Sequence, residues 1–463
     1  MEPRSLTYVA DGCGGELLNG SPAATIARVC TDSRQAQPGD LFIALAGDKF
    51  DGHDYLDAAE QKGVVAAVVQ RTKARKLRCA VVAVENPRQA LGHLAARYRR
   101  DFHLPVIAVG GSNGKTTTKE LLASVLRQRF KTLWSEASFN NDIGVPLTLL
   151  RLDPGHEMAV LEVGTNHPGE LAPLVRMIEP QFGVITNLGR EHLEFFGDLN
   201  GVADEQGWLA ELLPANGKLF IHGDSPELER ILRRTRVEVT RVGFGPDNDW
   251  RASAVRLDEA GATFQVETAD AEFCGEYRVN LLGRHQVVNS LLAAAVGAES
   301  GLMRNEIQRG LAECQPPKMR MQVWTVNGVR VLDDAYNANA DSVLAALETL
   351  KEFPCQGRRV AVLGEMAELG PHSAEAHAEV GRRAAETRVD QLFAVGKMAG
   401  VMGAAARAAG LMHVTELGEA DTGASAVRHF VRSGDVVLIK ASRASRLERV
   451  GEALRGDKKK QTQ

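Results

Sequence analysis

A glycine-rich loop between an apolar strand and a helix is the feature that most constrains the fold of this chain. The loop, GSNGKTT at residues 111–117, follows the buried-strand pattern VIAV and precedes the amphipathic pattern TKELLASVL. Glycines let backbone N–H groups turn toward phosphate oxygens, the helix start adds partial positive charge, Lys115 can bridge outer phosphates and the Thr116 hydroxyl can bind Mg²⁺. Val109 stands six residues before Lys115, so the loop is a short variant of G-x-x-x-x-G-K-[ST]. We predict an ATP site built on Gly111, Ser112, Asn113, Gly114, Lys115, Thr116 and Thr117.

The chain is too long for a single hydrophobic core. Its 463 residues exceed the roughly 250–300 at which one core stops growing, so two to three domains are expected. A composition of 44% hydrophobic, 25% charged and 5% aromatic residues is typical of a globular α/β protein rather than a fibrous or low-complexity one. The formal net charge of −4 argues against a general nucleic-acid surface, but it leaves room for one local site that binds an anionic small substrate.

The cysteines and the apolar stretches indicate the compartment. The six cysteines are scattered and form no C-x-x-C pair, so neither a disulfide framework nor a zinc cluster is predicted. No stretch approaches the roughly 18 apolar residues of a membrane span, and the first residues lack a signal-peptide pattern. We expect a protein of the reducing cytoplasm that is neither secreted nor inserted in a membrane.

Strand and helix patterns divide the chain into three α/β domains. Residues 1–85 have the pattern of a small α/β unit, and residues 86–314 begin with a helical, Arg-rich connector and continue with alternating strands and helices. Pro316 and Pro317 then end a run of helix formers, because proline lacks the amide donor that a helix requires. Residues 315–463 hold four apolar strand-like runs, each followed by a helix-compatible stretch, which indicates a doubly wound, mostly parallel sheet. The tail GDKKKQTQ is predicted to be solvated and disordered.

Two polar residues lie where strands of the central domain are expected to end. Glu162 closes the apolar run AVL, and His192 follows the run FGVI within TNLGREHLE. Active residues collect at the carboxyl ends of strands in α/β sheets, and a carboxylate or an imidazole could complete a metal shell. Taken alone, Glu162 could equally be a surface acid and His192 a structural histidine. No H-E-x-x-H or G-x-S-x-G motif occurs, so zinc peptidase and serine hydrolase activities lack support.

A series of motifs along the whole chain resembles the successive motifs of the Mur ligases, in the order of that family. They are GSNGKTTTK (111–119), FNNDIGVPLTLL (139–150), EVGTNHPGE (162–170), TNLGREHLE (186–194), LGRHQVVN (282–289), DDAYNANADS (333–342), LGEMAELG (363–370) and LIKASR (438–443). Together with DSR (32–34) and DGH (51–53), the motifs at 333–342 and 363–370 are most similar to the branch of the family that adds D-alanyl-D-alanine.

The resemblance implies an ATP-dependent, ADP-forming ligase that uses Mg²⁺. The γ-phosphate of ATP would pass to the terminal carboxylate of UDP-N-acetylmuramoyl-tripeptide (UDP-MurNAc-tripeptide), and the amine of D-Ala-D-Ala would attack the resulting acyl phosphate. This is the final cytoplasmic step toward the peptidoglycan precursor UDP-MurNAc-pentapeptide. The resemblance further implies a small UDP-binding domain, a central P-loop ATPase-like parallel-sheet domain, and a C-terminal Rossmann-like domain that closes over the nucleotide. We expect a monomer, although one sequence does not determine the oligomeric state.

The resemblance also implies site residues from all three domains. Lys115, Glu162, His192 and Lys440 would be catalytic, with Thr116 and Glu162 holding a first Mg²⁺ and His192 helping to hold a second. Further nucleotide contacts would come from Asn289, Arg320, Asn337 and Arg443, and UDP-substrate contacts from Ser33, Arg34, Asp51 and His53. Without the family context these residues would be interpreted as solvated side chains, polar turns and helix caps.

The sequence departs from the family pattern near the second metal. Gln206 stands where the family has a lysine that is carbamylated to give an additional metal-binding carboxylate, and Trp208 replaces the usual nearby acid. Because glutamine cannot be carbamylated, we predict a more weakly held second metal or partial compensation by Asp204 or Glu205. Smaller departures occur where asparagine, proline and glycine are usual, at Gln286, Arg190 and Met319.

Two alternatives remain open. One is a neighbouring ligase, either the branch that adds a diamino acid or a folylpolyglutamate synthase-like enzyme. The diamino-acid branch is disfavoured because no D-N-P-R motif occurs, and the nearest string, ENPR at residues 85–88, lies in the wrong region. The other is a non-catalytic nucleotide-binding regulator, which Gln206 favours and the intact phosphate loop, Glu162, His192 and Lys440 disfavour.

Overall fold

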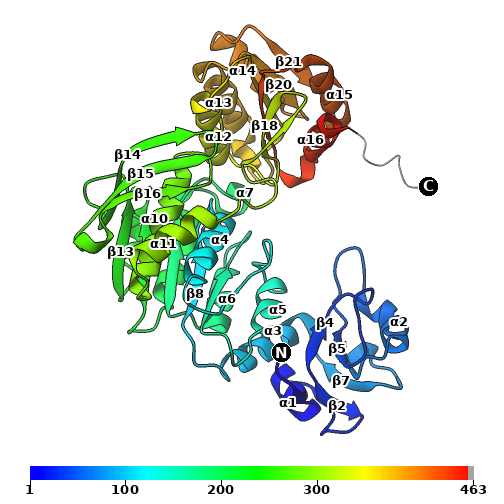
Figure 1. The fold of residues 1–463 in the computed structure, drawn as a ribbon. Coiled ribbons are helices and arrows are strands. Elements are labelled where there is room, and N and C mark those ends of the chain that lie inside the picture. Colours follow the sequence, from blue (N-terminus) through cyan, green and yellow to red (C-terminus); the bar gives the residue numbers. More distant parts are fainter. Residues whose placement is uncertain (457–463) are drawn as a thin grey trace.

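Three large β-sheets follow one another along the chain. The computed structural model describes residues 1–456, and Figure 1 shows the N-terminal and C-terminal sheets at opposite ends of the central sheet. Mixed α/β architecture with several parallel sheets, as predicted from the sequence, is confirmed. The predicted disordered tail falls, after its first residue, outside the described residues. Among the described residues, no helix is long and apolar enough to cross a membrane.

The N-terminal sheet is parallel apart from its first edge strand. Its order is β2 (Glu16–Asn19), β7 (Ala80–Val84), β6 (Ala66–Gln70), β5 (Asp40–Ile43) and β4 (Arg28–Cys30). Helix α1 (Leu6–Cys13) packs on one face and α2 (Leu56–Gln61) on the other, so the apolar runs of β5, β6 and β7 are buried on both sides. A small ribbon pairs β1 (Arg4–Ser5) with β3 (Thr25–Ile26).

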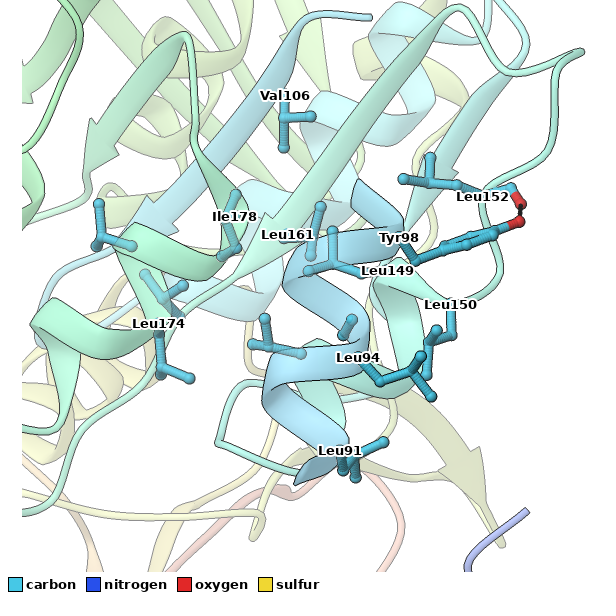
Figure 2. Close-up of a cluster of buried hydrophobic side chains, with 14 of the residues drawn as sticks. Leu91, Leu94, Tyr98, Val106, Leu149, Leu150, Leu152, Leu161, Leu174 and Ile178 are labelled. Carbon is cyan, nitrogen blue, oxygen red and sulfur yellow. Dashed lines mark hydrogen bonds between the residues drawn. The ribbon is translucent and has the colours of Figure 1, made fainter. Parts of the chain in front are cut away.

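Helix α3 (Pro87–Arg99) joins the first sheet to the second. It starts at Asn86, whose side-chain oxygen accepts the Arg88 N–H at 2.9 Å, and Pro87 occupies the first turn, where no amide donor is needed. One face of α3 packs on α1, and the opposite face packs on α5 (Gly144–Leu149) and α6 (Leu171–Ile178) of the central domain. Figure 2 shows the part of this apolar cluster between α3 and the central domain, where the Tyr98 hydroxyl donates to the Leu152 carbonyl at 2.7 Å. The two sheets therefore share one continuous core.

The central sheet winds in two directions from β8 (Val106–Gly110). Its nine strands run in the order β16, β15, β14, β13, β12, β11, β8, β10, β9. Their bounds are β9 (Thr132–Trp134), β10 (Met158–Glu162), β11 (Phe182–Ile185), β12 (Lys218–His222), β13 (Glu238–Gly243), β14 (Trp250–Asp258), β15 (Gly261–Thr268) and β16 (Gly275–Val279). The strands from β9 to β14 are parallel, and β15 and β16 add an antiparallel extension. Because β8 lies between β10 and β11, its carboxyl end is a switch point of the kind where ligands bind.

Helices cover both faces of the central sheet. The alternation of β8 sends Val106 and Ala108 into the core under α3 and α6, and Ile107 and Val109 into the core under α4 (Lys115–Leu126) and α10 (His285–Glu299). The remaining helices are α7 (Leu193–Phe196), α8 (Leu199–Glu211), α9 (Leu228–Leu232) and α11 (Arg304–Glu313).

The C-terminal sheet has six strands in the order β17, β18, β22, β19, β20, β21, and only the β17–β18 pairing is antiparallel. Its strands are β17 (Gln322–Val326), β18 (Val329–Asp334), β19 (Arg359–Leu363), β20 (Gln391–Val395), β21 (Val414–Leu417) and β22 (Val436–Lys440). Its helices are α12 (Ala340–Glu352), α13 (Ser373–Glu386), α14 (Ala399–Ala408), α15 (Ala420–Phe430) and α16 (Glu448–Arg455). They bury both faces of the sheet, as expected for a doubly wound fold.

Candidate functional site

A cavity of about 1340 Å³ lies between the central and C-terminal sheets, at the carboxyl ends of their strands. The structure brings most of the predicted central and C-terminal site residues to its wall, including the phosphate loop, Glu162, His192, Asn289, Arg320, Asn337 and Lys440. The cavity continues along α3 and α6, where Arg88, His93 and Arg176 line it. Residues separated by more than 300 positions in the sequence therefore face one space.

The phosphate loop has the backbone that its glycines predict. Gly111 and Gly114 have φ values of +109° and +81°, in the region that side chains rarely adopt. A Cβ atom at Gly114 would lie 2.8 Å from Asn289 Oδ1, so Asn289 packs directly against the loop. The Asn113 N–H donates to Asn187 Oδ1 at 2.7 Å and the Gly111 N–H donates to Gln206 Oε1 at 2.8 Å. The neighbouring elements thus hold the loop in shape.

Lys115 folds back over the loop. Its Nζ donates to the carbonyl oxygens of Gly111 and Ser112, at 2.5 and 2.9 Å, and pairs with Glu191 Oε2 at 3.1 Å. The ammonium group therefore lies against the loop backbone, beside the position expected for bound phosphates.

Two buried oxygen atoms at the site have no hydrogen-bond partner within the described part of the chain. They are Thr116 Oγ1, at the start of α4, and Glu162 Oε2, at the end of β10. Glu162 is 1% exposed, and its other oxygen accepts from Asn140 Nδ2 at 2.8 Å. A buried carboxylate oxygen and a buried hydroxyl without partners are unfavourable unless something binds them, and both are ligand types that Mg²⁺ prefers. These residues fit a magnesium ion.

His192 stands where β11 leads into α7. Its backbone is left-handed, with φ of +47°, and its Nδ1 bonds Glu368 Oε2 of the loop after β19. Sequence reasoning singled out His192 but missed its neighbour Glu191, which is 4% exposed and lines the same cavity. An acidic residue directly before His192 in a strand-end motif was the available signal.

Gln206 lies beneath the phosphate loop rather than in solvent. It is 1% exposed, accepts from the Gly111 N–H through Oε1 and donates through Nε2 to Glu191 Oε1 at 3.1 Å. The prediction that Asp204 or Glu205 compensates for it is wrong. Asp204 pairs with Arg230 on the outer side of α8. Both Glu205 oxygens accept backbone N–H groups at the start of α6, so neither carboxylate faces the cavity.

The C-terminal sheet contributes Lys440. It ends β22 in register with Asp334 of β18, and it is 3% exposed. Its Nζ donates to Asp334 Oδ2 at 2.6 Å and to the Asn337 carbonyl at 3.0 Å. Nearby, the Arg320 guanidinium lies 4.2 Å from the centre of the Tyr336 ring. This wall of the cavity therefore combines positive charge with an aromatic face, which suits a nucleotide.

Arg443 lies apart from the other predicted nucleotide residues. It is exposed, its guanidinium is 4.0 Å from Met319 Sδ and 3.4 Å from Glu448, and it does not line the cavity. Met319 has a left-handed backbone with φ of +56°, which explains why glycine suits this position better.

The predicted UDP-substrate residues lie in the N-terminal unit, outside this cavity. Arg34 is highly exposed and bonds Asp32 through its Nε and Nη2, and these contacts lower the pKa of Asp32 to about 2. His53 is buried, with Nδ1 bonded to Asp51 at 2.6 Å and Nε2 accepting from the Gln70 N–H at 2.9 Å. Both ring nitrogens of His53 are thus occupied within the fold, whereas Arg34 is open to a ligand.

Family models for the Mur ligases match along most of the chain. They are the Mur ligase family catalytic domain over residues 25–99, the Mur ligase middle domain over 109–297, and the Mur ligase glutamate ligase domain over 319–443. The chain belongs to the Mur ligase family. Arg443 closes the third match, and the phosphate loop, Glu162 and His192 all lie in the second.

Individual Mur ligases match this one over nearly its whole length. The UDP-N-acetylmuramoyl-tripeptide–D-alanyl-D-alanine ligase of Escherichia coli (strain K12) is 35% identical, over 97% of this chain and 98% of the relative. A crystal structure of MurF from Acinetobacter baumannii superimposes with a TM-score of 0.91 at 29% identity, covering 99% of this chain and 100% of that one. MurF from Thermotoga maritima in complex with ADP gives a TM-score of 0.81 at 28% identity, covering 92% and 97%.

Proposed function

We propose that this Mur ligase joins D-Ala-D-Ala to UDP-MurNAc-tripeptide with conversion of ATP to ADP and phosphate, the final cytoplasmic step toward UDP-MurNAc-pentapeptide. One observation carries the proposal: the phosphate loop, two unpartnered oxygens and Lys440 meet around one cavity. The full-length relative and the solved structures of the same branch support this acceptor and this amine over a diamino acid.

Phosphoryl transfer requires mainly positioning and charge neutralisation. The loop N–H groups and Lys115 would hold the β- and γ-phosphates, for which Lys115 exchanges its bonds to Gly111, Ser112 and Glu191 for phosphate oxygens. Lys440 would approach the same phosphates from the C-terminal sheet. A carboxylate oxygen of the tripeptide then attacks the γ-phosphorus and ADP leaves, which produces an acyl phosphate. The amine of D-Ala-D-Ala attacks its carbonyl carbon, loses a proton and expels phosphate.

Magnesium fits the unpartnered oxygens already described. Thr116 Oγ1 and Glu162 Oε2 would hold a first ion, and His192 would help to hold a second. Bound Mg²⁺ supplies positive charge that neutralises the transferred phosphate. Asn140 orients the Glu162 carboxylate, and Glu368 orients the His192 ring, so each ligand has a positioning partner.

Substrate binding would use all three domains, with boundaries at 1–85, 86–314 and 315–463. Asn289, Arg320 and Asn337 would border adenine and ribose, and closure of the C-terminal domain would bring Arg443 to the nucleotide. Ser33 and Arg34 would contact the uridine diphosphate, while Asp51 and His53 shape the neighbouring turn. The enzyme would act as a cytoplasmic monomer.

Phosphate release tests the proposal. The purified protein is given ATP, Mg²⁺ and either UDP-MurNAc-tripeptide or UDP-MurNAc-dipeptide, each with D-Ala-D-Ala, diaminopimelate or lysine. Turnover only with tripeptide and D-Ala-D-Ala is expected, and Lys115→Ala should abolish it. Turnover with dipeptide and a diamino acid would assign the other branch, and no turnover in any combination would support a nucleotide-binding regulator.

A further inference from the structure

Gln206 is built into the site although it cannot be carbamylated. It lies under the phosphate loop with both ends of its amide engaged, Oε1 on the Gly111 N–H and Nε2 on Glu191 Oε1. An amide oriented by a backbone donor on one side can only donate on the other. Gln206 therefore does not carry a carboxylate itself, but its Nε2 donates to the carboxylate of another residue.

Glu191 is that carboxylate. It is 4% exposed, its Oε1 accepts from Gln206 at 3.1 Å and its Oε2 pairs with Lys115 at 3.1 Å. A buried carboxylate is stable only when paired, and here Lys115 supplies the opposite charge. Glu191 also lines the cavity together with His192, Glu162 and Thr116.

We propose that Glu191, positioned by Gln206, provides the carboxylate that the family otherwise obtains from a carbamylated lysine, and that it binds the second Mg²⁺ together with His192. The inference rests on the proposed function, because only a ligase of this mechanism needs a second ion there. It follows that this enzyme assembles its metal site from encoded side chains and needs no bicarbonate to do so.

Lys115 explains how Glu191 becomes available. In the absence of nucleotide the ammonium group balances the Glu191 charge, and when ATP binds, phosphate oxygens take over Lys115. Glu191 Oε1 then keeps its bond to Gln206, while Oε2, which Lys115 has released, can bind an ion in the cavity. Thr116 Oγ1 and Glu162 Oε2, which have no partner among the described residues, would remain the ligands of the first ion.

Manganese binding tests the assignment without relying on turnover. Mn²⁺ is titrated by electron paramagnetic resonance into the full-length protein with a non-hydrolysable ATP analogue and UDP-MurNAc-tripeptide. The wild type is expected to bind two ions, and Glu191→Gln should weaken the second at least tenfold while the first is retained. Two ions bound equally well by Glu191→Gln would overturn the proposal, as would a single ion in the wild type.

A matched control and an exchange variant complete the test. Asp204→Asn removes a carboxylate from the same helix as Gln206. Because the Asp204 side chain pairs with Arg230 and not with the site, this change should leave both Mn²⁺ affinities unchanged. The double variant Glu191→Ala, Gln206→Lys should recover the second ion only when bicarbonate is added. Bicarbonate dependence in the wild type would contradict the proposal. Phosphate release with D-Ala-D-Ala decides the proposed function separately, because the Mn²⁺ titration requires no amine substrate.

Discussion

The Arg190 guanidinium donates two hydrogen bonds, of 2.8 and 2.6 Å, to one carboxylate oxygen of Asp341, and the Arg190 backbone N–H donates to the other oxygen at 2.7 Å. Arg190 belongs to the loop that carries His192, and Asp341 lies in the first turn of α12. A third residue, Glu379 of α13, also accepts from Arg190. Salt bridges of Arg190 therefore link the central domain to the C-terminal domain directly beside the site.

Breaking this connection should weaken nucleotide use. We expect Arg190→Met and Asp341→Asn each to lower kcat/KM for ATP about three- to tenfold, because both side chains are about one-third exposed and such pairs contribute about 1 kcal/mol. The double variant should be no worse than the worse single variant. Steady-state kinetics in a double-mutant cycle measures the coupling, and strictly additive losses would show that the pair is not coupled.

Glu162→Gln should separate activity from stability. The change removes a buried charge whose Oε2 has no partner in the described residues, so the ligand-free protein should melt at the same temperature or higher. Phosphate release should fall at least about 100-fold, since the first Mg²⁺ loses its carboxylate. Thr116→Val should behave in the same direction. Calorimetry and kinetics on both variants check this, and a lower melting temperature with an unchanged Mg²⁺ requirement would contradict it.

His377 should make the C-terminal sheet sensitive to acid. The ring is fully buried, its Nδ1–H donates to the Ser373 carbonyl at 2.7 Å, and its Nε2 accepts from the Met366 N–H at 3.0 Å. Burial lowers its pKa below the ordinary 6.5. A histidine with a lowered pKa contributes stability that is complete above about pH 6.5 and is lost as the pH falls toward the folded-state pKa.

The His377→Gln variant keeps a hydrogen-bond acceptor for the Met366 N–H, but its side chain does not titrate. The variant should be less stable at pH 7.5 by about 1 kcal/mol, because it loses the bond to Ser373. Its melting temperature should fall less than that of the wild type between pH 6.5 and 5. Differential scanning calorimetry across this range is the measurement. Parallel pH curves for the two proteins would show that His377 does not titrate there.

Arg34 should determine affinity for the UDP substrate. The double variant Ser33→Ala, Arg34→Ala should raise KM for UDP-MurNAc-tripeptide about tenfold or more with little change in kcat, because a guanidinium–pyrophosphate contact is charge-assisted. Arg75→Ala is the matched control, since Arg75 is an exposed arginine of the same unit that pairs with Asp57. An equal effect of both changes on KM would make the uridine assignment wrong.

The candidate residues whose position in the fold could best be predicted from the sequence are those near the end of a strand. Lys115, Glu162 and His192 each follow an apolar run, and Lys440, which the family resemblance singled out, is the last residue of such a run. Parallel strands bring their carboxyl ends to one edge of the sheet. Their meeting at one cavity could therefore be anticipated from order and pattern. The three sheets followed from the same runs.

Other parts of the site depend on contacts that no local pattern encodes. Gln206 reaches Glu191 and Gly111 only because α8 crosses beneath the loop, and Glu205, one residue earlier on the helix, points to α6 instead. A shift of one position along a helix turns a side chain by about 100°, so adjacency in sequence misled the compensation hypothesis. Likewise, Arg443 lies only three residues after Lys440, the last residue of β22, yet its side chain is exposed and does not line the cavity.

Helix α3 ties the N-terminal sheet to the central sheet more extensively than any one helix ties the central sheet to the C-terminal one. The N-terminal and central sheets bury one common apolar core, so rotating the unit that carries Arg34 away from the phosphate loop would expose apolar side chains to water. The C-terminal sheet contacts the site through polar pairs such as Arg190–Asp341 and Asn339–Asn113, so the closure proposed above would be a movement of this sheet. A substrate bound through its uridine end would then have to bridge a fixed distance between the unit that carries Arg34 and the phosphate loop. A peptide one residue too short would leave its carboxylate out of reach of the γ-phosphate.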